Sequence, residues 1–384
     1  TADVAVLSAS QAQALSTAQV AALSTSQVQA MSTAGVSGLT TDAIKGLSNN
    51  QLQAMTTAGV AAMTTTQVGA LGTAQIAALT STEAAALTTT QVQALSSSQV
   101  SALEVGDLSA MSTSQVAALT TSQLQVFNTA QIAALSSSQL GSIGTDQLQS
   151  LKPGLISALR TEALAGLSTE QMEAFTPAQI VQMSSQQIGA LSEDQVAAIG
   201  TDDVAALTGR QLSAMSTAQV QSLTTDQIVA LKPSQVVSIP TQSIAALTED
   251  QISAFTGPQV AYLTNSQMGA LTSDQVAAIT TDQIPQLKAA QLASISTAGL
   301  AGLDSTQIEA FSAVQIGGLR TDQIAAMATE QIAAIASEDI RGLTRQQMAA
   351  LQSDQVGGLT SEQVSALNAT QIAAIETQDL IALS

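Results

Sequence analysis

Leu23-Ser24-Thr25-Ser26-Gln27-Val28-Gln29-Ala30 is one copy of an eight-residue unit that fills the whole chain. Counted from the Leu as position 1, the unit reads L-[ST]-[ST]-x-Q-[VI]-x-A, and every eighth residue from Leu7 to Leu383 is Leu, Ile, Met or Phe. No insertion or deletion interrupts this spacing. Because so short a unit can bury its apolar side only against its neighbours, the period predicts a tandem-repeat array rather than a single globular core.

The unit has the features of a helix start. Ser or Thr at position 2 is a favoured N-cap, and Gln at position 5 then falls at N3, where its side chain closes a capping box. Positions 1 and 6 become the two members of a hydrophobic staple. Position 3, the first helical residue, accepts Pro at Pro153, Pro177 and Pro233.

The exact N-cap position stays open between positions 2 and 3. Some units lack a capping side chain at position 2 and carry Thr at position 3. These units contain Gly72-Thr73, Arg160-Thr161, Arg320-Thr321 and Ala328-Thr329.

Two other architectures fit the period poorly. In a continuous helix the Leu would drift by about 80° per unit, and a β-solenoid requires a period of two, whereas positions 1 and 6 have opposite parity. We therefore expect an all-α solenoid over residues 1–384, of about 47 octads with one short capped helix each and about three octads per turn. Positions 1 and 6 should line the core. The small residue at position 8 should lie where another backbone approaches.

Composition excludes several classes of function. The chain has 28 acidic and 9 basic residues, a net charge of -19, which argues against nucleic acid and anionic lipid as partners. Residues 1–100 carry only Asp3, Asp42 and Glu83 against Lys45. The chain has no Cys and no His, so thiolate chemistry and the commonest general base are absent. No apolar run approaches the roughly 18 residues that span a bilayer, and we expect no membrane insertion.

Few residues suggest chemistry. Four acidic pairs could bind Ca²⁺, but acidic residues in a first helical turn also complement the helix dipole, which we favour because no spaced calcium loop is present. These pairs are Glu193-Asp194, Asp202-Asp203, Glu249-Asp250 and Glu338-Asp339. Gln at position 5 either caps its own helix or also forms a ladder between turns. No group is available to activate a Ser nucleophile. We predict no enzyme, with no catalytic, cofactor-binding or metal-binding residue and no cofactor.

Two resemblances to known families bear on function. Phe175-Thr176-Pro177-Ala178-Gln179-Ile180-Val181 resembles the start of a TAL-effector repeat, but the longer unit, base-reading loop and basic helices of that family are absent. Over its whole length the chain resembles octad arrays of the TTxQIxAL kind in very large secreted or surface-exposed bacterial proteins, described as adhesin-like or haem-utilisation-like. This resemblance implies an extracellular, non-enzymatic spacer or filament and transfers no functional residue. The absence of His argues against a haem role.

The functional hypothesis is a structural rod or filament at the cell surface or in the extracellular matrix: a surface fibre, an adhesin stalk or a matrix component. Its expected partner is the chain itself, through head-to-tail copies or flanking repeats. The alternatives are a scaffold that binds a peptide or glycan, with the neighbourhood of Tyr262 as its most distinctive surface, and an ice-binding protein.

The two ends prompt a further expectation. Thr1 stands at position 3 and Ser384 at position 2 of their units, so joined copies would keep the octad phase. We expect end-to-end assembly or a longer parent array, from which a signal peptide or preceding segment was removed. Leu383→Asp and Val4→Asp would test that joint.

Overall fold

A computed structural model describes residues 2–376 of the chain. The chain divides into two compact units, Thr1–Ile199 and Gly200–Ser384. Within the described residues, the secondary structure consists of α-helices of four to six residues and two 3-10 helices, with no strand. The predicted all-α architecture with one short helix per octad is therefore confirmed. That the two units form one continuous solenoid stays a prediction.

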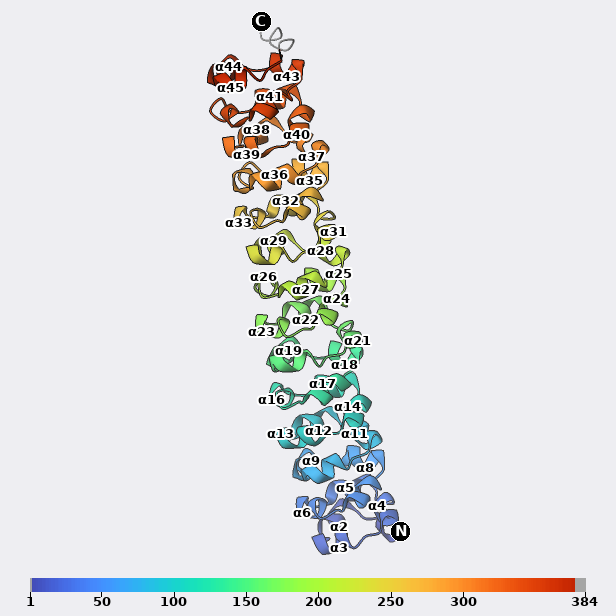
Figure 1. The fold of residues 1–384 in the computed structure, drawn as a ribbon. Helices are drawn as coiled ribbons and strands as arrows, with labels where there is room; N and C mark the ends of the chain where they lie inside the picture. The colour runs from blue at the N-terminus through green and yellow to red at the C-terminus, as the bar shows by residue number, and fades with distance from the viewer. Residues whose placement is uncertain (1, 377–384) are drawn as a thin grey trace. The chain divides into compact units, whose positions relative to one another are not determined.

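The helices follow one another at the octad spacing in both units (Figure 1). The first unit contains α1 (Ala2–Ala5), α2 (Ala9–Gln13), α3 (Thr17–Ala21), α4 (Thr25–Gln29), α5 (Thr33–Gly38), α6 (Thr41–Lys45), α7 (Asn49–Gln53), α8 (Thr57–Ala62), α9 (Thr65–Ala70), α10 (Thr73–Ala77), α11 (Ser81–Ala86), α12 (Thr89–Ala94), α13 (Ser97–Ala102), α14 (Val105–Ala110), α15 (Thr113–Ala117), α16 (Thr121–Leu124), α17 (Thr129–Ala134), α18 (Ser137–Gly141), α19 (Thr145–Ser150), α20 (Pro153–Ile156), α21 (Thr161–Leu164), α22 (Thr169–Glu173), α23 (Pro177–Ile180), α24 (Ser185–Gly189) and α25 (Glu193–Ala197).

The second unit contains α26 (Thr201–Val204), α27 (Gly209–Ser213), α28 (Thr217–Gln221), α29 (Thr225–Ala230), α30 (Pro233–Val236), α31 (Thr241–Ile244), α32 (Glu249–Ala254), α33 (Gly257–Val260), α34 (Asn265–Gly269), α35 (Ser273–Ala277), the 3-10 helix η1 (Ile284–Gln286), α36 (Ala289–Ser294), α37 (Thr297–Ala301), α38 (Ser305–Glu309), α39 (Ala313–Gly318), α40 (Thr321–Ala326), α41 (Thr329–Ala333), the 3-10 helix η2 (Ile340–Gly342), α42 (Arg345–Met348), α43 (Ser353–Gly357), α44 (Ser361–Ala366) and α45 (Ala369–Ile372). In η1, Pro285 stands inside the helical segment, where it supplies no N–H for an α-helical bond.

From α2 onward, each α-helix begins at position 3 of its octad, after an N-cap at position 2, whereas the two 3-10 helices begin at position 6. In α12 the Thr88 hydroxyl accepts the Gln91 N–H at 3.2 Å, and Gln91 Oε1 accepts the Thr88 N–H at 2.7 Å, which completes the capping box. The N-cap stays at position 2 even where that residue is Gly72 or Ala328 and offers no side-chain bond. The alternative of a cap at position 3 is therefore wrong. The N3 Gln still accepts the N-cap N–H in these units, so the register does not depend on the hydroxyl.

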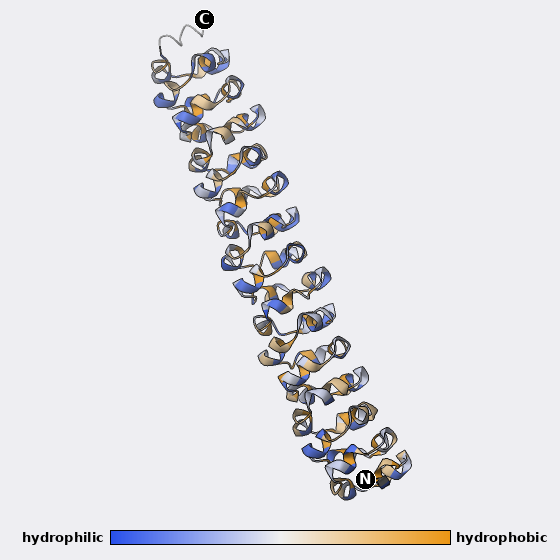
Figure 2. Cartoon of the chain, turned by 90° about the vertical axis from the view of Figure 1, so that its right-hand side faces the viewer, coloured by the Kyte–Doolittle hydropathy of each residue, from blue (hydrophilic) through white to orange (hydrophobic). Residues whose placement is uncertain are grey.

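The core of each unit is built from equivalent positions, as predicted. Position 6 is fully buried at Val92 and Ile132, and position 1 is nearly so at Leu95 and Leu135. Figure 2 shows the hydrophobic residues gathered on the inner side of each unit, with hydrophilic residues outside. A third buried position, Gln at position 5, was not predicted as part of the core; Gln91 is only 1% exposed.

Small residues at position 8 allow successive turns to approach closely, as predicted. A Cβ added to Gly166 would overlap the backbone of Ser137, and one added to Gly342 would overlap the backbone of Ala313. Both contacts join residues 29 apart in sequence. No described residue has positive φ, so these glycines are required for space and not for backbone conformation.

Candidate functional site

The most regular polar feature of the molecule is a set of hydrogen bonds between turns, which we call the glutamine link. In the link at Gln91, Nε2 donates to the carbonyls of Val60 at 3.0 Å, Ala61 at 3.3 Å and Met63 at 2.7 Å. These carbonyls lie at and just beyond the C-terminal end of α8, where a helix leaves carbonyls without intrahelical partners. One amide therefore satisfies the start of its own helix through Oε1 and the end of an earlier helix through Nε2.

The glutamine link recurs throughout both units with residue separations of 28 to 31. Gln115 donates to Ala84, Ala85 and Leu87, and Gln259 donates to Ile228, Val229 and Leu231. The ladder between turns and the local cap were the two interpretations of this Gln, and the structure contains both.

The same bonds determine how many octads make a turn. Gln91 lies on α12, which packs against α9 and bonds to the end of α8. Each helix thus lies over the gap between the third and fourth helices before it. The packed helices are three octads apart, and the bonds of the link reach 28 to 31 residues back, which places one turn between three and four octads. The predicted three octads per turn is therefore slightly low, because each helix rests between two helices of the preceding turn.

Carboxylates replace the amide at four interior positions 5, namely Glu83, Asp107, Asp203 and Asp339. A carboxylate can accept the N-cap N–H but has no N–H to donate onward. Glu83 Oε1 and Asp203 Oδ1 are buried and have no hydrogen-bond partner. Asp339 differs, since its Oδ1 accepts the Ala313 N–H at 2.7 Å. Sequence reasoning treated Asp203 and Asp339 as members of acidic pairs and did not consider that they replace the Gln at position 5.

Burial and the neighbouring carboxylate of Asp202 raise the pKa of Asp203 to about 6. The folded chain therefore holds this proton more tightly than the unfolded chain does, and the stabilisation is lost as pH rises through about 6. We expect Asp203→Asn to raise the free energy of unfolding at neutral pH by about 2–3 kcal/mol and to leave it unchanged near pH 4. Urea unfolding across this range measures the difference. Asp202→Asn is the exposed control, with a smaller expected gain; equal pH profiles for parent and Asp203→Asn would contradict the assignment.

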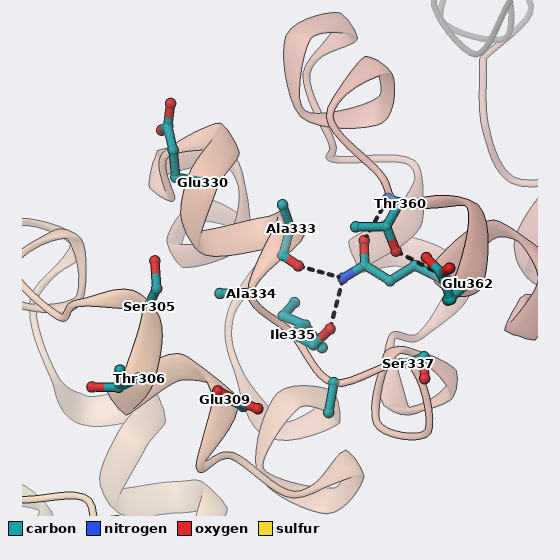
Figure 3. Close-up of a pocket in the computed structure, with 12 residues that line it drawn as sticks. Ser305, Thr306, Glu309, Glu330, Ala333, Ala334, Ile335, Ser337, Thr360 and Glu362 are labelled. Atoms are coloured by element: carbon teal, nitrogen blue, oxygen red, sulfur yellow. Dashed lines mark hydrogen bonds between the residues drawn. The ribbon is translucent and has the colours of Figure 1, made fainter.

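Grooves lie between successive turns at equivalent positions. One groove of about 590 Å³ is lined by Ala334, Ser337, Glu309, Glu330 and Glu362, among others (Figure 3). On its wall the glutamine link runs from Gln363 to the carbonyls of Ala333 and Ile335. Equivalent grooves lie beside Thr248 and Asp274 and beside Ser168 and Asp194.

The acidic side chains around these grooves do not converge. In Figure 3, Glu330 points away from Glu309, and Glu362 lies on the far side of Ile335. Among residues 2–376 no group of three acidic side chains could hold a metal ion. The pairs Glu193-Asp194, Asp202-Asp203 and Glu249-Asp250 lie in first helical turns, as the dipole interpretation requires. Glu338-Asp339 instead immediately precedes η2, with Asp339 as its N-cap.

The remaining predictions concern membrane insertion, Tyr262, the chain ends and the absence of site residues. In the part of the chain that the structure describes, no helix combines the length and apolarity needed to cross a membrane. Tyr262, whose neighbourhood the sequence suggests as a binding surface for a peptide or glycan, is about half exposed beside the end of α33. Thr1, Leu383 and Ser384 lie outside the described residues. That the chain has no catalytic, cofactor-binding or metal-binding residue stays a prediction.

Comparison with known proteins identifies the repeat. A family model described as the ALTTAQ repeat matches residues 1–33, 47–81, 100–137, 156–185, 173–200, 196–233, 292–329 and 332–369. These segments cover more than half of the chain. The letters of the repeat correspond to positions 8, 1, 2, 3, 4 and 5 of the octad, which are the small residue, the core Leu, the N-cap, the first two helical residues and the linking Gln. No curated protein matches the chain. The protein is therefore a tandem-repeat structural protein that belongs to the ALTTAQ repeat family.

Proposed function

We propose that the protein serves as a non-enzymatic extracellular or cell-surface rod or filament element. The observation that carries the proposal is the glutamine link, because within each unit it joins many successive turns by the same set of bonds. Such a link allows an array to be extended without a new kind of interface. The acidic composition keeps a long array soluble and disfavours nucleic acid as a partner.

Location is the first test. Protease treatment of intact source cells, followed by detection of the protein, should remove it if it stands on the surface or in the matrix. A cytoplasmic marker protein is the control. Protection of the chain together with that marker would contradict an extracellular role.

The proposed partner is a further turn of the same kind, from the same chain or from another copy. Leu7, Leu15 and Leu23 are half-exposed, although position 1 is buried elsewhere in the first unit. The Nε2 groups of Gln11 and Gln19 donate to no carbonyl among residues 2–376, while their Oε1 atoms close capping boxes. This face presents the donors and apolar side chains that a turn with free helix-end carbonyls would cover.

We expect the purified chain to form head-to-tail assemblies by sedimentation velocity and electron microscopy. Leu15→Asp should reduce assembly by placing a charge on the apolar face, while circular dichroism remains helical. Gln13→Asp is the matched control. It adds the same charge at an exposed position on the neighbouring α2, away from the apolar face. Assembly of Leu15→Asp equal to that of the control would reject this face as the joint.

A second candidate is a scaffold for a peptide or glycan, and the recurring grooves beside Glu362, Asp274 and Asp194 favour it. Array-based screening against peptides and glycans distinguishes it from a purely structural role. No observation favours ice binding, because the position-2 hydroxyls are used as N-caps.

A further inference from the structure

Three carboxylates gather at one contact in a stretch of the chain that is otherwise uncharged. Between Lys45 and Asp146 the only charged residues are Glu83, Glu104 and Asp107. Glu83 lies on α11, Asp107 lies on α14, and Glu104 is the N-cap of α14. Helices α11 and α14 pack against each other, one turn apart (Figure 1). The fold therefore concentrates all the charge of this stretch at one joint between two turns.

Glu83 occupies the place of a linking Gln without the donor that the link requires. Its Oε2 accepts the Thr80 N–H at 2.7 Å and the Thr80 hydroxyl at 2.8 Å, as a linking Gln Oε1 would. Its Oε1 takes the place of the amide nitrogen; it is buried and has no partner. The carbonyls at separations of 28 and 31 belong to Met55 and Leu52, and no side chain of the described residues donates to them. The Leu52 carbonyl keeps the Met55 N–H, but Glu83 Oε1 and the Met55 carbonyl are left without a donor between them.

Asp107 repeats the defect on the next turn. It is 2% exposed, and its Oδ2 accepts the Glu104 N–H at 3.2 Å, longer than most capping bonds in the chain. Its Oδ1 is 3.5 Å from the Ser81 hydroxyl. The carbonyls of Ile76 and Leu79, which a Gln here would bond, receive no side-chain donor from the described residues. Burial chiefly, with the charges of Glu104 and Glu83, raises the pKa of Asp107.

The surroundings offer no cation to balance these charges. The helices packed on the pair are α8, before α11, and α17, after α14, and neither contains a titratable residue. The three acids do not form a group that could hold a metal ion within the described chain. A carboxylic acid, in contrast, has the shape of the Gln amide and one O–H to donate. The ligand that fits this joint is a proton.

We propose that Glu83 and Asp107, on the contacting helices α11 and α14, form a proton-binding joint, in which a carboxyl O–H takes the place of the missing amide donor toward the ends of α7 and α10. With both groups ionised, buried oxygens face carbonyls and the two turns separate more readily. Proton uptake supplies the missing donor and tightens the joint.

Hydrogen exchange of the full chain, followed by mass spectrometry at pH 7 and about pH 5 and corrected for intrinsic exchange, tests the joint. Amides of residues 49–110 should become about fivefold or more better protected at the lower pH, the change expected when one missing hydrogen bond is restored. The double variant Glu83→Gln with Asp107→Asn should show the acid-level protection at both pH values. It restores amides at position 5, so loss of folding is not expected.

Two controls distinguish proton binding at this joint from other causes of pH-dependent amide protection. Residues 113–142, whose position-5 residues are all Gln, should show no pH-dependent protection. Glu104→Gln removes the exposed charge at the N-cap but leaves both buried acids, so the pH response should persist. Equal protection of parent residues 49–110 at both pH values, or a pH response that survives in the double variant, would overturn the proposal. Protection at pH 7 by added Ca²⁺ and its loss with a chelator would also overturn it, in favour of a cation site.

Discussion

Gln91→Leu should lower the free energy of unfolding by about 3–5 kcal/mol. The Leu side chain fills a similar volume but removes the acceptor for the Thr88 N–H and the donor for the Val60 and Met63 carbonyls. The Val60 carbonyl keeps the Met63 N–H, but the part-buried Thr88 N–H and the Met63 carbonyl lose their only side-chain partner, and that cost is what makes the effect large. Urea unfolding followed by circular dichroism measures the loss.

Gln93→Leu is the matched control for this change. Gln93 lies two residues further along the same helix and is exposed, so its replacement should change stability by no more than about 0.5 kcal/mol. If the two variants unfolded at the same urea concentration, the glutamine link would not be a principal source of cohesion between turns.

Gly166→Ala should lower the free energy of unfolding by about 3 kcal/mol. The added methyl group would overlap the backbone of Ser137, which cannot move aside as the end of a flexible side chain could. The two turns must therefore separate locally, and the packing around Leu164 should loosen with them. Urea unfolding and the exchange rates of amides in α18 and α21 report the change.

Gly154→Ala provides a control with the opposite sign. Gly154 lies in the first turn of α20, and a Cβ there would meet no atom within 4 Å. Alanine restricts the unfolded chain and favours the helix, so this variant should gain about 0.5–1 kcal/mol. A loss of stability in both variants would show that general helix effects, and not the close approach at Gly166, explain the first result.

The local features of the octad could be predicted from sequence because they depend on residues three to five apart. Thr88 and Gln91 form the capping box that their spacing implies, and Leu87 and Val92 are buried as the staple requires. The need for a small residue at position 8, as at Gly166, was also predictable. Where the cap side chain is missing, at Ala328, sequence reasoning left two registers open, and the structure resolves them through Gln331, whose Oε1 accepts the Ala328 N–H.

The acids at position 5 illustrate what local reasoning missed. Asp203 was interpreted as half of an acidic pair at a helix start, and Glu83 was noted only as one of few charges. Each looks ordinary beside its own helix, where a carboxylate caps as well as Gln does. The carboxylate lowers stability only because its second oxygen is buried without a hydrogen-bond donor, among groups that are distant in the sequence.

The sequence by itself determined the unit, its capped helix and its apolar positions, because each of these follows from interactions within one octad or at its border. The small eighth residue was also visible in the repeat pattern, although the contacts that require it lie between turns. Only the tertiary structure decided that a turn contains between three and four octads and that the Gln at position 5 is a core residue. The physical reason is the range of the contacts. Gln91 reaches carbonyls 28 to 31 residues away, and which carbonyls lie there depends on how each helix rests between two helices of the preceding turn.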